Sequence, residues 1–136
     1  MEADEAIFDN NMRNNALNMD ALDVPGNHDL VYIDPPYINS LGTGVHYAEF
    51  YHFLEGLLEY NNWAGQIQYK IKHRPIKTDK SMWCDADKIS SAFNNVFKKI
   101  RKSIIVVSYR NDGIPSLSEL KELLLQYKKS SAFGNA

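Results

Sequence analysis

The chain has 136 residues, of which 44% are hydrophobic and 24% charged, with a formal net charge of −2. This composition is typical of one globular domain and excludes wholesale disorder, while the small net charge supplies no general attraction for nucleic acid, so any DNA contact needs a local basic patch. One cysteine excludes an intramolecular disulfide or a cysteine-based zinc cluster, and no apolar run approaches the ~20 residues of a membrane-spanning helix, so we expect a cytoplasmic protein without a metal site or membrane contact.

The first predicted strand lies near residue 30. Before it, the sequence is weakly patterned and rich in asparagine, which competes with helix hydrogen bonds, so we expect a short or frayed helix. A turn signal, VPGN at 24–27, then leads into LVYI (Leu30 to Ile33), a continuous apolar run typical of a strand buried on both faces of a parallel sheet. The tetrapeptide DPPY (Asp34 to Tyr37) follows this strand directly.

Two helices are predicted between DPPY and the next strand. After the loop INSLGTGVH, helical spacing predicts an amphipathic helix from Tyr47 to about Asn61, with the apolar residues Phe50, Phe53, Leu54, Leu57 and Leu58. The segment from 62 to 82 has no clear period, although GQIQYKI would fit a short strand. A second helix, with Asp85 or Asp87 as its N-cap, is predicted from six apolar residues on one face: Ile89, Ala92, Phe93, Val96, Phe97 and Ile100.

A second strand and a last helix complete the predicted fold. SIIVVSY (Ser103 to Tyr109) is apolar and β-branched, which favours a strand. After the turn RNDGIPS, SLSE (Ser116 to Glu119) matches a capping box, and the helix that follows has the apolar residues Leu117, Leu120, Leu124 and Tyr127. Strands separated by long helical segments indicate βαβ crossovers, so the predicted fold class is α/β, with a mostly parallel sheet and flanking helices.

DPPY lies where open α/β sheets bind ligands, beyond the carboxyl end of a strand. Pro35 restricts Asp34 to extended geometry, and Pro36 does the same to Pro35, so the segment is rigid before a ligand arrives. The acid and the free Pro35 carbonyl suit the two hydrogens of an exocyclic amine, while Tyr37 can stack on a planar base. Such an amine would attack a sulfonium methyl group without a metal. Alternatively, Asp34 caps a helix and the prolines mark a turn.

The sequence resembles the Dam-like family of N6-adenine DNA methyltransferases, which carry DPPY at the end of the fourth core strand. IIVVSYRNDGIPS resembles a later strand and turn of that family, MWCDADKISSAFNNVFKKI resembles the helix before it, and NMDAL (18–22) resembles the place of an acidic cofactor contact. The similarity covers roughly residues 18–128. It implies a partial Rossmann-like methyltransferase fold that uses S-adenosylmethionine on double-stranded DNA, in a bacterial restriction-modification setting.

The resemblance also implies roles for individual residues. Asp34, Pro35 and Tyr37 would hold a flipped-out adenine, Pro36 would keep the loop rigid, and Asp20 together with Asp34 would contact S-adenosylmethionine. Substrate and DNA contacts would come from two further groups: Ser108, Tyr109 and Arg110 beside the cleft, and Lys72, His73 and Arg74 on the DNA backbone. Basic runs such as YKIKHRPIK (69–77) and KKIRK (98–102) are most often solvated faces.

Two parts of the family pattern are missing from the sequence. No glycine-rich cofactor loop precedes DPPY, and the GTG at 42–44 lies after it. Only a few residues separate NMDAL from the DPPY strand, which leaves no room for a target-recognition domain. We therefore expect residues 1–136 to form a single, incomplete catalytic domain that binds S-adenosylmethionine weakly alone. A homo-oligomer, or a complementing chain with the cofactor loop, would complete it.

Three other functions fit parts of the pattern. DPPY also serves enzymes that methylate cytosine N4, RNA bases or glutamine side chains, because all present a planar, amide-like nitrogen. A catalytically inactive, oligomeric remnant of a methyltransferase is a second alternative, since unpaired sheet edges favour association. A carboxylate-based hydrolase, with Asp34 beside Glu49 or Glu55, has less support because no second acid has the spacing of a motif.

Overall fold

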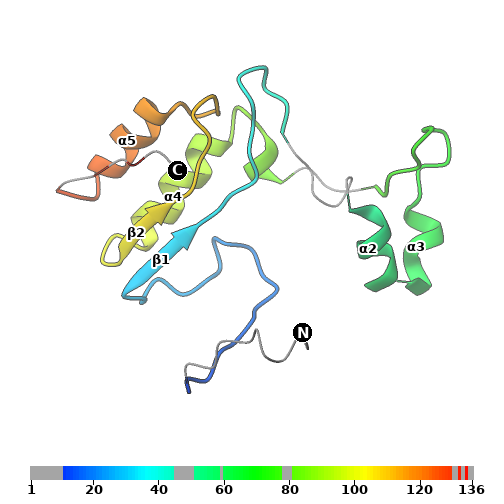
Figure 1. The fold of residues 1–136 in the computed structure, drawn as a ribbon, viewed down its shortest axis with the longest axis horizontal. Coiled ribbons are helices and arrows are strands. Elements are labelled where there is room, and N and C mark those ends of the chain that lie inside the picture. The colour runs from blue at the N-terminus through cyan, green and yellow to red at the C-terminus, as the bar shows by residue number, and fades with distance from the viewer. Residues whose placement is uncertain are drawn as a thin grey trace, which may run out of the picture.

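The computed structural model of the protein describes residues 11–44, 51–58, 60–77 and 81–129, together with 132 and 134. Its elements follow the chain in the order β1 (Leu30–Ile33), α2 (His52–Leu58), α3 (Tyr60–Gln66), a 3₁₀ turn η2 (Met82–Cys84), α4 (Ile89–Lys99), β2 (Ile104–Val107) and α5 (Leu117–Leu125) (Figure 1). The predicted helix residues 47–50 lie outside the described residues.

The two strands form a parallel pair, as the sequence predicted. Leu30 pairs with Ile104 and Ile33 with Val107, and α4 lies in the crossover between the strands. Val31, Ile33, Ile105 and Val107 face the core, which includes residues of α4 and α5. The α/β class is therefore confirmed, as a small parallel sheet with helices packed on it.

The other face of the sheet is uncovered within the described residues. Its side chains are 42–65% exposed, and they are Leu30, Tyr32, Ile104 and Val106. The prediction of a strand buried on both faces is therefore wrong for this part of the chain, because the described helices provide a layer on one face only. An apolar face of this kind is the usual mark of a surface that another segment covers.

The core is built around the predicted apolar face of α4. Phe93 and Phe97 are fully buried, and their ring centroids lie 5.5 Å apart. Trp83, from η2, meets Phe93 edge-on at 5.3 Å, while Leu120 of α5 closes the other side of the cluster. The predicted N-cap is wrong: Lys88 takes that position, and Asp85 instead accepts a hydrogen bond from the Asp87 N–H and pairs with Lys88 at 3.2 Å.

The segment after DPPY differs most from its prediction. Instead of one helix to about Asn61, it forms two short helices, α2 and α3, which pack on each other apart from the sheet (Figure 1). They approach closely at Gly56, where an added Cβ would lie 2.2 Å from the Trp63 ring. The apolar residues that predicted the helix are 51–84% exposed, namely Phe53, Leu54, Leu57 and Leu58. These residues do lie on a helix, but no described segment covers its apolar face.

Two other predictions also need correction. Residues 11–29 hold turns and no helix, so a short helix at the start is absent from the described part of that region. The possible strand in GQIQYKI is replaced by the end of α3 at Gln66 and by a single antiparallel bridge between Ile67 and Ile76.

Helix α5 begins with the predicted capping box. The Ser116 hydroxyl accepts a hydrogen bond from the Glu119 N–H at 3.3 Å, and the Glu119 carboxylate accepts one from the Ser116 N–H at 2.8 Å. Replacing Ser116 by alanine is expected to lower the free energy of unfolding by about 1 kcal/mol, because the first turn of α5 loses its cap. Urea denaturation would measure the change. Ser118→Ala, inside the same helix, is the control and should not destabilise the protein.

Candidate active site at the carboxyl end of strand β1

The DPPY tetrapeptide begins where the β1–β2 ladder ends. The last ladder bond runs from the Ser108 N–H to the Ile33 carbonyl at 2.9 Å, and Asp34 follows with an exposed side chain. Pro35 is buried, whereas Pro36 and Tyr37 are half-buried. The Tyr37 hydroxyl donates a 2.6 Å hydrogen bond to Asp34 Oδ1. The tyrosine therefore orients the carboxylate, and Asp34 does not cap a helix.

Strand β2 brings Tyr109 to the same edge of the sheet. Its ring meets Phe93 edge-on at 5.6 Å and lies 5.9 Å from the Tyr37 ring. The Tyr109 hydroxyl donates to the Ile114 carbonyl. Burial raises the pKa of Tyr109 to about 12, partly offset by the nearby Arg110 charge. Tyr109 thus links the core to Tyr37, and its hydroxyl is already engaged.

Replacing Tyr109 by phenylalanine is expected to remove a tyrosine that ionises near pH 12. Because the pKa of Tyr109 is higher in the folded than in the unfolded protein, its contribution to the free energy of unfolding is complete below pH 10, the unfolded value. That contribution disappears as the pH rises toward 12. The ultraviolet absorbance of tyrosinate, titrated in both proteins, would show the difference. If the absorbance difference between the two proteins were already complete at pH 11, roughly midway between these two values, Tyr109 would not be the shifted group.

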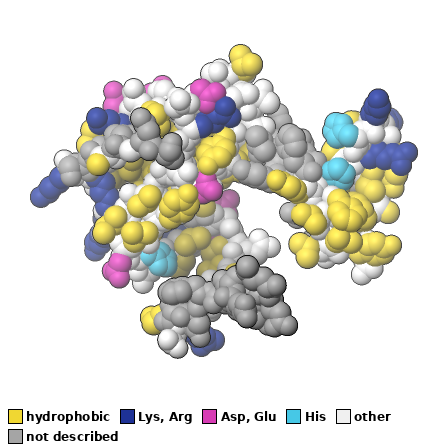
Figure 2. All heavy atoms as spheres, in the orientation of Figure 1, with side chains coloured by type: hydrophobic (Ala, Val, Ile, Leu, Met, Phe, Trp, Pro, Cys, Tyr) yellow, Lys and Arg dark blue, Asp and Glu magenta, His cyan; other side chains and the backbone are white. Residues whose placement is uncertain are grey.

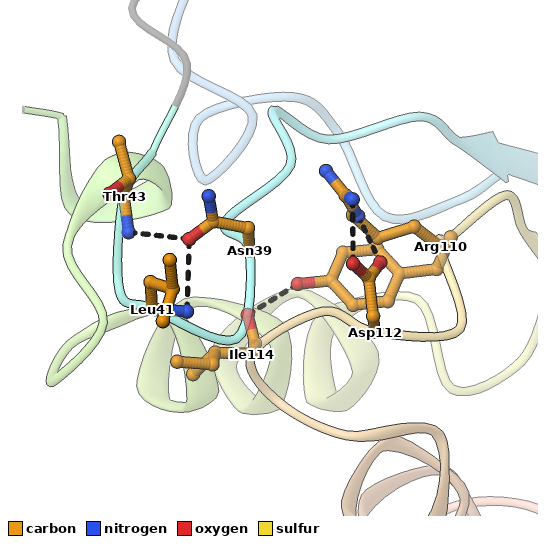
Figure 3. Close-up of polar contacts among 7 residues, drawn as sticks. Asn39, Leu41, Thr43, Arg110, Asp112 and Ile114 are labelled. Carbon is orange, nitrogen blue, oxygen red and sulfur yellow. Dashed lines mark hydrogen bonds and ion pairs between the residues drawn. The ribbon is translucent and has the colours of Figure 1, made fainter.

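The loop predicted after DPPY contacts the β2 side through Asn39, a role that sequence reasoning missed. Asn39 Oδ1 accepts hydrogen bonds from the Leu41 and Thr43 N–H groups at 3.0 and 2.9 Å, which shapes residues 39–44 (Figure 3). Asn39 also bridges to Gly113, where an added Cβ would lie 2.6 Å from the Tyr109 ring. The local signal was INSLG, an asparagine shortly before a glycine, which is a turn pattern.

Arg110 is engaged beside this loop. Its guanidinium donates two hydrogen bonds to the Asp112 carboxylate, and the one from Nη2 to Oδ2 is 2.8 Å long (Figure 3). This hydrogen bonding lowers the pKa of Asp112 and raises that of Arg110. Both side chains are exposed, so the pair adds little stability. A DNA phosphate would have to compete with Asp112 for the guanidinium.

Asp20 lies near the opposite end of the sheet. Its carboxylate accepts a hydrogen bond from the Leu22 N–H at 2.8 Å, inside its own turn. The Leu22 carbonyl, in turn, accepts one from Lys99 at the end of α4, next to the start of β2. The structure therefore does not bring Asp20 together with Asp34, and of the two predicted cofactor contacts only Asp34 lies at the carboxyl end of β1.

The predicted DNA-backbone residues lie in a third place. Lys72, His73 and Arg74 belong to the loop after α3, in the unit that stands apart from the sheet (Figure 1). All three are exposed. Two absences hold for the part of the chain that the structure describes: no cluster of three or more histidine, cysteine or acidic side chains could hold a metal ion, and no helix is long and apolar enough to cross a membrane.

An α/β unit with DPPY at the end of a parallel strand is compatible with a methyltransferase fold, and the chain is similar to known methyltransferases. The chain is 33% identical to the type II methyltransferase M.FokI of Planomicrobium okeanokoites over 96 residues, and 33% identical to the modification methylase StsI of Streptococcus sanguinis over 126 residues. It is 29% identical to the type II methyltransferase M.CviAII of Paramecium bursaria Chlorella virus 1 over 112 residues. The chain is therefore a homologue of part of the type II DNA methyltransferases, which confirms the predicted resemblance.

These matches cover most of the chain but little of each relative. They span 71% of the chain and 14% of M.FokI, 91% and 18% of StsI, and 82% and 31% of M.CviAII. No protein-family model and no solved structure matches the chain. The relatives support DNA methylation in general.

Proposed function

We propose that the chain forms the target-base side of a DNA adenine-N6 methyltransferase that uses S-adenosylmethionine. The observation that carries this proposal is the arrangement at the end of β1, where the Asp34 carboxylate, the Pro35 carbonyl and the Tyr37 ring follow one another in a rigid segment. The relationship to type II DNA methyltransferases supplies the substrate class.

The acceptors fit an exocyclic amine. Asp34 Oδ1 is bound by Tyr37, so Oδ2 is left for one amine hydrogen. Pro35 is buried, and its carbonyl accepts no hydrogen bond from any described residue. This carbonyl is therefore left to accept a hydrogen bond from a ligand N–H. Two acceptors on adjacent residues match the two hydrogens of an adenine amine.

S-adenosylmethionine, when bound, would supply an electrophilic methyl group. The residues of this chain would hold the amine nitrogen in place, and the negative charge of Asp34 would stabilise the positive charge that develops on that nitrogen. Tyr37 would stack on the base, while Tyr109, held between Phe93 and Tyr37, would fix the position of Tyr37. From this position Asp34 would also contact the cofactor.

The proposed DNA contacts come from two elements. Ser108 and Arg110 flank Tyr109 after β2, at the edge where DPPY lies. Lys72, His73 and Arg74 would contact phosphates from the loop after α3, where all three are exposed.

A complementing segment belongs to the same proposal. The face with Leu30, Tyr32, Ile104 and Val106 is 42–65% exposed, and the relatives are more than three times longer than their matched segments. We infer that a further methyltransferase segment, with the glycine-rich cofactor loop, covers this face. It would restore cofactor binding that the chain alone has weakly or not at all. Calorimetry that showed tight one-to-one binding of S-adenosylmethionine to the isolated chain would contradict this.

A chimera tests the proposed function. The aligned 96-residue segment of M.FokI would be replaced by the corresponding residues of this chain, and methylated DNA would be digested to nucleosides. N6-methyladenine is the expected product. N4-methylcytosine would favour the alternative amino-methyltransferase, since cytosine offers the same kind of amine to Asp34 and Pro35. If no base were methylated, photocrosslinking of azidoadenine-containing DNA to the isolated chain would decide: a crosslink outside residues 34–37 would argue for an inactive remnant.

A further inference from the structure

We propose that the loop of residues 67–76, here called the basic loop, docks on duplex DNA with its lysines on phosphates and Ile71 inserted into a groove. This inference rests on the proposed function for the class of ligand. It goes beyond the proposed contacts of Lys72, His73 and Arg74 with the DNA backbone, because it adds a contact of Ile71 with the bases.

Charge is distributed very unevenly around the basic loop. Residues 60–78 contain four of the chain's 15 lysines and arginines and none of its 17 aspartates and glutamates. The remainder of the chain is therefore acidic, and this segment is a local positive patch. No ion pair involves these cations among the described residues. Figure 2 shows the Lys and Arg side chains gathered at the far end of the unit that α2 and α3 form.

The base of the basic loop is held by backbone hydrogen bonds. Gln68 N–H donates to the Pro75 carbonyl at 2.9 Å, and Lys77 N–H donates to the Gln66 carbonyl at 2.8 Å. At the end of the loop, Pro75 and Ile76 are buried, and Ile76 is only 6% exposed. Between these anchors, residues 69–74 are all exposed. Hydrogen bonds therefore close the base of the loop, and the cationic side chains between them are exposed.

Tyr69 orients one of the cations. The Arg74 guanidinium lies over the Tyr69 ring, 5.9 Å from its centroid, and the Tyr69 hydroxyl donates to the Ala64 carbonyl of α3 at 3.3 Å. Arg74 has a φ of 46°, in the left-handed region that arginine rarely adopts. Within the loop, its N–H donates to the Ile71 carbonyl at 2.9 Å. The Tyr69 ring and the backbone hydrogen bond to Ile71 therefore hold Arg74 in position.

Ile71 lies in the turn between Lys70 and Lys72. Its side chain is 38% exposed and belongs to no part of the described core. An apolar side chain flanked by cations is the pattern of proteins that insert a wedge between base steps while lysines neutralise the phosphates on either side. A protein partner fits the basic loop less well, since Ile71 alone is too small an apolar surface for a stable interface, and the exposed apolar side chains of α2 belong to a separate element.

Fluorescence anisotropy with a short labelled DNA duplex tests this docking. The chain would be titrated over a series of NaCl concentrations, and the slope of log affinity against log salt would be compared between variants. Lys70→Gln combined with Lys72→Gln should reduce the slope by roughly 1.8, because each lost phosphate contact removes about 0.9. Ile71→Ala should weaken binding at least about threefold at an unchanged slope, because only apolar contact is lost.

The matched control is Lys98→Gln combined with Lys102→Gln, which removes the same charge from two exposed lysines in the other basic run. The control should leave the slope unchanged. If it lowered the slope as much as the loop variant, or if Ile71→Ala bound duplex as tightly as the parent, the basic loop would not be the docking element. Equal binding of an RNA hairpin or of anionic vesicles would also overturn it.

The same assay separates this inference from the proposed function. Asp23→Ala, at an exposed aspartate outside both the site and the basic loop, should bind duplex DNA with the parent slope. Duplex binding that depends on Lys70, Ile71 and Lys72, together with no methylated base from the chimera and a crosslink outside residues 34–37, would refute the proposed function and leave the docking loop standing. If the chimera methylated adenine while the loop variants bound duplex DNA as tightly as the parent, the proposed function would stand and the docking role of the basic loop would be refuted.

Discussion

Methyl transfer by the M.FokI chimera is expected to fall at least about a hundredfold when Asp34 is replaced by alanine, because the developing charge on the amine loses its nearest carboxylate. The carboxylate sits at the end of β1, and the Tyr37 hydroxyl holds it by a 2.6 Å hydrogen bond. Asp34→Asn keeps the shape but removes the negative charge and places an N–H₂ donor toward the amine, so it should be nearly as inactive. Incorporation of labelled methyl into DNA measures both variants.

Two further variants separate the direct effect of Asp34 from an indirect one. Asp34→Ala also removes the hydrogen-bond partner of Tyr37, so Tyr37→Phe, which loses that bond but keeps the ring, should retain most of the activity if Asp34 acts on the base. Asp23→Ala removes an exposed aspartate from the turn before β1 and should leave the rate unchanged. A rate for Asp34→Ala close to that of the parent would show that the amine is held by other groups.

The elements that sequence alone predicted correctly are those whose signal is local. The apolar spacing of α4, the β-branched run of β2 and the Ser116–Glu119 capping box each depend on residues within a few positions of one another. DPPY was predicted beyond a strand for the same reason, and the structure places it there. Its proposed role in base binding still depends on the resemblance and on experiment.

The predictions that failed depend on what lies opposite a residue in space. LVYI is apolar throughout, but the sequence cannot say that no described helix covers Tyr32, and helical spacing from Phe53 to Leu58 does not reveal that α2 ends early and packs on α3 through Gly56. The contact of Asn39 with Gly113 joins segments far apart in the chain. Asp20 stays a predicted cofactor contact, and its turn is held by Lys99 near the end of the sheet opposite DPPY.

Replacing Phe93 by alanine is expected to lower the free energy of unfolding by about 4 kcal/mol, because a fully buried ring leaves a cavity in the core. Stability of a domain this size is about 5–15 kcal/mol, so most of it could be lost. With a urea dependence of about 2 kcal/mol per molar, the midpoint of denaturation should fall by roughly 2 M. Phe53→Ala, at a side chain that is 58% exposed, is the matched control and should change stability by about 0.5 kcal/mol or less.

The consequence for the site distinguishes Phe93 from other core residues. Its ring meets Tyr109 edge-on at 5.6 Å, and Tyr109 lies 5.9 Å from Tyr37, so packing passes from the core to DPPY through two aromatic contacts. Phe93→Leu, which keeps the fold more easily, should therefore let the pKa of Tyr109 fall from about 12 toward 10 as its ring gains access to water. A tyrosinate titration of the folded variant that matched the parent would show that Tyr109 is buried by other neighbours, and that the core does not position the site through this ring.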